Sequence, residues 1–144
     1  MRILICAFTY WPAVDGVQNV TEYQAEGLAA RGHDVTVLTG YLPEKNLPEE
    51  EEHNGVHIRR FAAYTETMLH HGDKAAYQRL LKEYAAKVDV IMTVCPESWC
   101  TDWAIPLAGQ LDCAMVMMTH GIHDFRWSTF KDKSMYGVAR KVWG

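Results

Sequence analysis

The feature that most constrains the fold is an unbroken apolar run near the N-terminus. Residues 3–8 read Ile-Leu-Ile-Cys-Ala-Phe and contain no polar side chain. A strand with one face in water alternates apolar and polar side chains, whereas a run without alternation suits a strand buried on both faces. Such strands occur in parallel sheets covered by helices on both sides. The run is therefore predicted to be the central strand of a parallel sheet.

The rest of the chain alternates between strand and helix patterns. Strands are predicted at 34–39, 55–61, 88–94 and 114–119, and helices at 17–31, 73–87 and 98–111. Gly32 can end the first helix with a positive φ, Asp73 can cap the second, and Pro106 perturbs the third. The predicted fold class is α/β: one Rossmann-like, doubly wound domain over residues 1–144, with a mostly parallel sheet and helices on both faces.

Two segments are predicted to be irregular. Residues 40–54 contain a run of four glutamates at 49–52, whose mutual repulsion opposes regular structure, so a solvated loop is expected. Residues 62–72 show no periodicity and include the adjacent pair His70 and His71. Because this pair lacks a second cluster of ligands, no metal site is predicted.

The distribution of charge argues against general nucleic-acid binding. Residues 1–125 carry nine Lys/Arg against seventeen Asp/Glu, a balance of −8, whereas 126–144 carry a balance of +4. Nucleic-acid binding needs a basic face that releases counterions from phosphates. The basic, aromatic segment 126–143 is compatible with peripheral membrane contact or with a buried helix that continues the fold.

Cysteine usage and the lack of a targeting pattern favour the cytoplasm. The four cysteines lie in or beside apolar runs without paired spacing, which is typical of free thiols in a core. No apolar run approaches the length of about 20 residues that a membrane helix needs, and the first run is too short for a signal peptide. A cytoplasmic protein is expected.

The carboxyl ends of the strands are where a ligand is expected, because parallel sheets bind ligands at the point where strand order reverses. The loops to consider are 9–16, 95–99 and 120–125. The first loop has no Gly-x-Gly-x-x-Gly pattern, and no acidic residue ends the second strand, so NAD binding is excluded. A Gly-Lys-Ser/Thr phosphate loop is also missing, which excludes a P-loop ATPase.

Gly16 and His120 are the candidate residues of these loops. Gly16 follows Asp15 directly before a helix, whose first N–H groups suit phosphate or sugar oxygens; the alternative is a glycine needed only for a tight turn. His120 follows the last strand and can donate a hydrogen bond to a sugar hydroxyl or offset charge near a breaking bond; the alternative is a structural turn histidine.

Four stretches of the sequence resemble one known family. They are Arg-Ile-Leu-Ile from residue 2, Tyr-Trp-Pro-Ala-Val-Asp-Gly-Val-Gln-Asn-Val from residue 10, Leu-Ala-Ala-Arg-Gly-His-Asp-Val-Thr-Val-Leu-Thr from residue 28, and Thr-His-Gly-Ile-His-Asp-Phe from residue 119. Together they resemble the N-terminal domain of the GT-B glycosyltransferases of family four. The resemblance spans nearly the whole chain.

The resemblance implies roles for individual residues. Gly16 matches the second of two adjacent glycines beside the donor phosphates, while Asp15 stands where the first is expected and is a candidate for binding a sugar hydroxyl. Gln18 matches a position that contacts the acceptor. His120 matches the histidine near the transferred sugar, and Gly121, which backs it, is counted with the binding residues.

The resemblance also implies an activity. The implied enzyme transfers a hexosyl group from a nucleotide-sugar donor to a glycan or lipid-linked acceptor. The transfer retains the anomeric configuration and uses no metal or other cofactor. In this family a second Rossmann-like domain holds most of the donor, and this chain contains none of it, so the chain is expected to be a fragment or truncated product that is inactive alone. The alternative is a non-catalytic carbohydrate- or protein-binding module.

Overall fold

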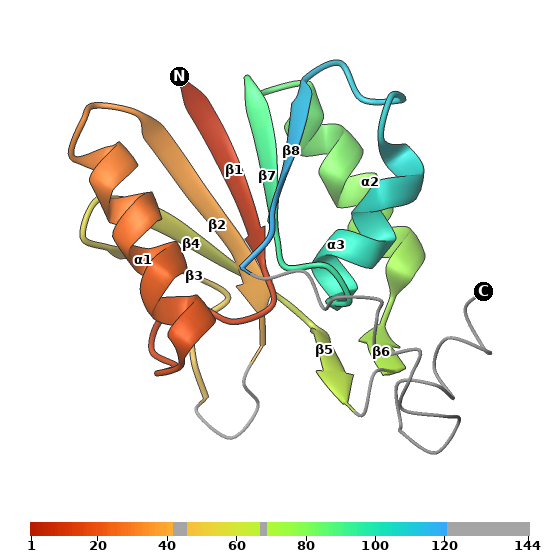
Figure 1. Ribbon diagram of the computed structural model, residues 1–144, viewed down its shortest axis with the longest axis horizontal. Coiled ribbons are helices and arrows are strands. Elements are labelled where there is room, and N and C mark those ends of the chain that lie inside the picture. Colours follow the sequence, from red (N-terminus) through yellow and green to blue (C-terminus); the bar gives the residue numbers. More distant parts are fainter. Residues whose placement is uncertain (42–45, 67–68, 121–144) are drawn as a thin grey trace, which may run out of the picture.

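The computed structural model describes residues 1–41, 46–66 and 69–120 (Figure 1). The strands are β1 (Arg2–Ala7), β2 (Asp34–Gly40), β3 (Glu50–His53), β4 (Val56–Phe61), β5 (Ala63–Glu66), β6 (Leu69–Gly72), β7 (Val90–Val94) and β8 (Ala114–Met118). The helices are α1 (Gly16–Ala29), α2 (Lys74–Ala85) and α3 (Trp99–Ala104), and α3 continues into a 3-10 turn at Ile105–Leu107. The predicted alternation of strands and helices is confirmed.

The main sheet has six strands in the order β3-β4-β2-β1-β7-β8. β1 lies between β2 and β7 and runs parallel to both, with Ile3 opposite Val35 on one side and Val90 on the other. The chain moves outward from β1 in one direction to β2 and β4, and in the other to β7 and β8. Strand order therefore reverses at β1, which makes the carboxyl ends of β1 and β7 the switch point.

Helices cover both faces of the sheet, as the apolar run in β1 predicts (Figure 1). Ile3 and Ile5 of β1 pack in the core layer beneath α1. Leu4 and Cys6 point to the opposite face and pack in the layer formed with α2 and α3. Because successive side chains of a strand alternate between faces, β1 contributes to both cores and is buried in each.

The predicted loop at 40–54 was wrong for its second half, because Glu50–His53 form the edge strand β3, antiparallel to β4. Strand pairing brings Glu50 opposite Arg59, and Arg59 Nε lies 3.6 Å from Glu50 Oε1. The next glutamate, Glu51, is bonded to the buried guanidinium of Arg60. Opposite charges on the neighbouring strand thus offset the repulsion within the glutamate run. The prediction of a loop took account only of the charges within the glutamate run, not of those on the neighbouring strand.

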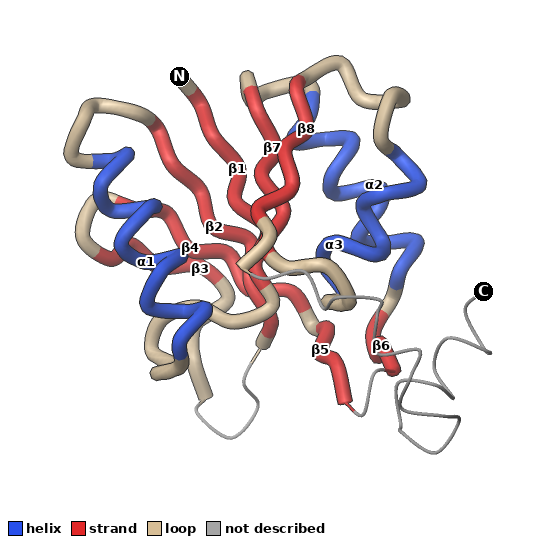
Figure 2. The backbone as a smooth tube through the Cα atoms, in the orientation of Figure 1, coloured by secondary structure: helices blue, strands red, loops and turns tan. Residues whose placement is uncertain are grey.

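The segment 62–72 was also predicted to be irregular, and that prediction was wrong. β5 and β6 form an antiparallel two-stranded sheet beside the main one (Figure 2). Its strands have only four residues each and include few alternating apolar positions, so the sequence carries little periodic signal. Tertiary contacts with α3, described below, hold the hairpin in place.

Other local predictions hold. Gly32 has φ 84° directly after α1, and the Asp73 side chain accepts a hydrogen bond from the Ala76 backbone at the start of α2. The third helix is shorter than predicted, because α3 ends at Ala104 just before Pro106. All four cysteines are free thiols. The segment 126–143 lies outside the described residues.

Membrane-spanning helices were not expected, and none is found among the helices of the described ranges: each is too short or too polar to cross a bilayer.

Gly40, at the end of β2, gives a test of the packing. A Cβ there would lie 2.9 Å from the Phe8 carbonyl oxygen and 3.0 Å from that of Ala63, both backbone atoms that cannot move aside cheaply. We expect Gly40→Ala to lower the free energy of unfolding by about 1–3 kcal/mol, measured by urea denaturation. The matched control is Gly16→Ala, where a Cβ meets nothing within 4 Å. Equal stability of the two variants would contradict this account of the close approach.

Candidate functional site

The candidate site lies at the carboxyl edge of the sheet, where the chain leaves β1, β7 and β8. The loop after β1 leads to the start of α1 at Gly16, and the loop after β7 leads through Cys95 to α3. His120 is the second residue after β8, with Thr119 between them. Because β1, β7 and β8 are neighbours in the sheet, these three exits lie next to one another.

Asp15 is the N-cap of α1. Its Oδ1 accepts a hydrogen bond from the Gln18 backbone at 2.8 Å, and its Oδ2 accepts one from the Thr9 hydroxyl at 3.0 Å. This is the usual role of an aspartate before a helix, and it closes the loop after β1. The position where the resemblance leads one to expect a first glycine is thus occupied by a capping side chain. Sugar binding by Asp15 stays a prediction.

Gly16 and Val17 leave their backbone N–H groups free at the start of α1. In the described part of the chain no acceptor is bonded to either group, as is common in the first turn of a helix. Gly16 is exposed, lies in the helix rather than at positive φ, and would tolerate a Cβ without contact. Its turn therefore does not require glycine, and the missing side chain leaves open space beside two free donors.

Gln18 points into the interior. Its side chain is 1% exposed, and its Nε2 lies 2.5 Å from Oε2 of Glu22 on the next turn of α1. Its Oε1 has no hydrogen-bond partner in the described structure. The structure thus gives Gln18 a buried contact within α1, and its predicted contact with an acceptor stays a prediction.

Cys95 interacts with both candidate loops, through a hydrogen bond with His120 and through the charge of Asp15. Its backbone N–H donates to the Met118 carbonyl at 2.9 Å, which ties the start of this loop to the end of β8. Burial raises the pKa of its thiol, a hydrogen bond from the His120 backbone lowers that pKa, and the negative charge of Asp15 raises it. The His120 backbone is thus hydrogen-bonded to the Cys95 thiol, and the charge of Asp15 acts on the same group.

His120 is exposed and begins the segment beyond β8. Its backbone is fixed by the contact with Cys95, while its imidazole faces solvent at the carboxyl edge. This position leaves the ring available to a ligand. Gly121 lies outside the described residues.

The loop after β7 holds a strained backbone. Cys95 has φ 61° and Glu97 has φ 63°, and neither is a glycine. Each such residue costs about 1–3 kcal/mol and persists only where its surroundings enforce it, which is frequent in functional sites. Here the Ser98 hydroxyl donates to the Val94 and Cys95 carbonyls, at 3.1 and 2.8 Å, and so holds the turn closed.

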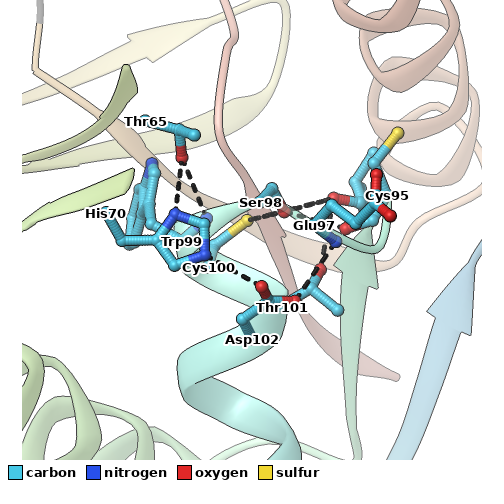
Figure 3. A network of polar contacts seen from close by, with 10 residues as sticks. Thr65, His70, Cys95, Glu97, Ser98, Trp99, Cys100, Thr101 and Asp102 are labelled. Carbon is cyan, nitrogen blue, oxygen red and sulfur yellow. Dashed lines mark hydrogen bonds and ion pairs between the residues drawn. The ribbon is translucent and has the colours of Figure 1, made fainter. Parts of the chain in front are cut away.

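A histidine and an aspartate that the sequence did not connect support this loop (Figure 3). His70 Nε2 lies 2.8 Å from Asp102 Oδ2, and His70 Nδ1 lies 3.1 Å from the Thr65 hydroxyl. Asp102 Oδ1 accepts the Glu97 N–H at 3.2 Å. The network joins the β5–β6 hairpin to the start of α3. The sequence signal that points to this network is Asp102 in the first turn of α3, because a carboxylate there suits the free N–H groups of the helix.

Two other features of the described residues lie away from the carboxyl edge. A hollow of about 610 Å³ opens at the opposite edge, lined by residues such as Arg2, Asp89 and Asp112 at the starts of strands. Its size does not make it the better candidate, because its walls hold an Arg2–Asp89 ion pair at 2.9 Å and no loop at a switch point. Three side chains arranged like metal ligands, Glu22, Glu26 and His53, lie on α1 and β3.

The geometry defines a class of protein: a Rossmann-like α/β domain with an exposed helix N-terminus after β1 and a histidine after β8, at the carboxyl edge of its sheet. Residues 15–143 match the sequence model of the glycosyl transferase 4-like domain, and the chain belongs to that family.

Comparison with solved structures agrees with the fold. The chain is similar to sucrose-phosphate synthase from Thermosynechococcus elongatus, with a TM-score of 0.62 and 19% sequence identity. The match covers 98% of this chain and 39% of that one, so this chain spans well under half of that protein. The predicted half of a GT-B fold is confirmed. A search of curated protein sequences finds no match.

The effect of the Asp15 charge on the Cys95 thiol gives a testable prediction. Asp15→Ala removes a negative charge that raises the Cys95 pKa, so the thiolate fraction at pH 8 rises and iodoacetamide alkylates Cys95 faster. Loss of the cap also lowers the free energy of unfolding by about 0.5–2 kcal/mol. Peptide mass spectrometry follows each cysteine separately.

The matched control is Asp73→Ala, which removes the same kind of cap from α2. It is expected to destabilise the chain similarly while leaving Cys95 alkylation at the wild-type rate. If both variants accelerate alkylation equally, general loosening rather than the charge of Asp15 controls the thiol.

Proposed function

We propose that the chain is the acceptor-side half of a retaining glycosyltransferase that moves a hexosyl group from a nucleotide-sugar donor to a glycan or lipid-linked acceptor. The observation that carries the proposal is the junction at the carboxyl edge where the α1 N-terminus, after β1, and His120, after β8, lie on either side of β7 in a domain of this family. One side of that junction offers free N–H donors, and the other offers an imidazole.

The two sides suit different parts of a sugar donor. The N–H groups of Gly16 and Val17, at the positive end of the α1 dipole, suit the diphosphate of the leaving group. The His120 imidazole suits a hydroxyl of the transferred sugar, or the charge that develops as the glycosidic bond to the phosphate breaks. Stabilisation by a helix N-terminus needs no divalent metal at the reacting atoms, so we propose metal-independent transfer.

A second domain completes the proposed site. Gly16 and His120 are both exposed at the carboxyl edge, so a partner domain could cover them. We propose that a second Rossmann-like domain closes over the edge and binds the nucleotide, and that this chain alone is inactive. The match to only 39% of sucrose-phosphate synthase supports this division. We propose a cytoplasmic location, where nucleotide sugars are available.

His120→Ala tests the role of the imidazole. In an enzyme extended through the second domain, we expect kcat to fall by about 10²–10³-fold, which is typical for removal of a group that stabilises a transition state. The control is His57→Ala, which removes an exposed histidine from β4. Initial rates with nucleotide-sugar donors measure both. Equal kcat in H120A and wild type would remove the imidazole from the mechanism.

Gly16→Ala tests the approach of the donor to the helix. Because a Cβ at this position meets no protein atom, the substitution leaves the fold intact but occupies the space beside the free N–H groups. We expect kcat/KM for the donor to fall by about 10- to 100-fold, the range for losing hydrogen bonds to a charged group. Added Mg²⁺ should leave the wild-type rate unchanged. An unaltered kcat/KM would place the diphosphate elsewhere.

The same experiments separate this proposal from a non-catalytic binding module. If the extended protein transfers no sugar, calorimetric titration with simple glycans and nucleotide sugars becomes the deciding measurement. Glycan binding that depends on His120 without any turnover would favour the module.

A further inference from the structure

A second cluster of chemically capable side chains lies away from the proposed sugar site, between α1 and the β3–β4 hairpin. Glu22 and Glu26 are one turn apart on α1 and so share a face of the helix. His53 ends β3 and reaches the same point from the hairpin. One ligand atom from each of the three residues lies within 4.8 Å of the other two.

The separations within this cluster suit ligands of one small ion. His53 Nε2 is 3.5 Å from Glu22 Oε1 and 3.7 Å from Glu26 Oε1, longer than ordinary hydrogen bonds. A tetrahedral Zn²⁺ with bonds of about 2.1 Å holds its donor atoms about 3.4 Å apart. Imidazole and carboxylate are both ordinary ligands for this ion.

Asn54 offers a fourth donor. Its Nδ2 lies 2.8 Å from Glu26 Oε1 and 3.2 Å from His53 Nε2. Rotation of the amide exchanges its nitrogen and oxygen, which would place Oδ1 beside the same two atoms. Asn54 and Gly55 have φ 49° and 79° and form the turn between β3 and β4, so the backbone fixes this side chain beside the cluster.

Gln18, next to the cluster, and Tyr10, in the core layer beneath α1, each keep one buried polar atom without a partner among the described residues. Gln18 is 1% exposed, bonds Glu22 through Nε2, and leaves Oε1 unpaired. Tyr10 is also 1% exposed, and its hydroxyl has no partner. Gln18 Oε1 is therefore an unpaired buried acceptor on the same amide that holds Glu22, and such an acceptor calls for a polar partner.

Neighbouring contacts already orient the ligands. The His53 ring is stacked on Trp11, with ring centroids 4.1 Å apart and planes 10° apart, which fixes its direction. The Gln18 amide holds the second carboxylate oxygen of Glu22. Such outer contacts are what a metal site uses to set its geometry.

We propose that Glu22, Glu26 and His53, with Asn54 as fourth donor, bind one divalent transition-metal ion of the Zn²⁺ class. The ion would join the middle of α1 to the β3–β4 hairpin. Its role is structural, and it is independent of the proposed sugar transfer, which takes place at the carboxyl edge.

Metal titration tests the site. The chain is freed of metal with a chelator and titrated with Zn²⁺ in competition with a chromophoric chelator. We expect one ion per chain, with affinity at least about 100-fold weaker in Glu26→Gln and Glu22→Gln, because loss of an outer contact alone costs about 10- to 100-fold. Zn²⁺ should also raise the Tm of wild type but not of E26Q. Circular dichroism checks that the variants are folded.

The matched controls are His57→Gln and Glu52→Gln, which alter another histidine and glutamate of the same hairpin. Those two side chains are paired at 3.2 Å and more than half exposed, without carboxylates from α1. Both controls should keep wild-type affinity. Absence of one-to-one binding, or wild-type affinity in E26Q, would overturn the proposal.

A measurement on wild type alone covers the case in which the variants do not fold. X-ray absorption at the zinc edge should show four nitrogen and oxygen donors, with one imidazole. A sulfur donor, or two imidazoles, would overturn the proposal by assigning the ion to the cysteines or to other histidines.

Discussion

The burial of β1 between two helical layers is the constraint on which the rest of the domain depends. Ile3 and Ile5 face α1, while Leu4 and Cys6 face α2 and α3, and all four side chains are 0–4% exposed. A strand buried in this way must satisfy its backbone groups within the sheet, so it needs a partner on each side. β2 and β7 supply these partners, and the exits of β1 and β7 consequently lie next to each other.

The carboxyl edge combines a rigid loop with open donors. The left-handed residues Cys95 and Glu97 are held by Ser98 and Asp102, and the network through His70 extends this support to the β5–β6 hairpin. A loop held at so many points has little freedom to collapse into the space beside Gly16. The backbone hydrogen bond from Cys95 to Met118 ties the same loop to the end of β8, just before His120.

α1 links the two regions discussed above. Its N-terminus faces the carboxyl edge, and its middle turns carry Glu22 and Glu26 toward the hairpin. Gln18 lies between them, with its backbone N–H on the Asp15 cap and its side chain on Glu22. Contacts that fix the middle of α1 against β3 and β4 therefore also fix the direction of the N–H groups in its first turn.

Local sequence patterns were enough to predict much of the fold and part of the geometry of the candidate site. The apolar run at 3–8 led to the central strand, and the pattern also placed His120 just after β8, at the carboxyl edge of the sheet. The segments 50–53 and 63–72 were missed, because their strands are stabilised by partners such as Arg59 and Asp102 rather than by their own periodicity. The pairing of His70 with Asp102, and of His53 with Glu22 and Glu26, joins residues about 30 apart in the chain.

By itself, the sequence determined the class of the domain, its central strand and the family to which it belongs. These depend on the order of apolar runs and on short motifs, both of which are local properties of a chain. Only the tertiary structure decided that Asp15 serves as a cap, that the backbone at position 16 does not require glycine, and that Gln18 is buried against Glu22. The physical reason is that burial and hydrogen-bond partners belong to the packed molecule, and strand order brings together side chains that no spacing along the chain relates.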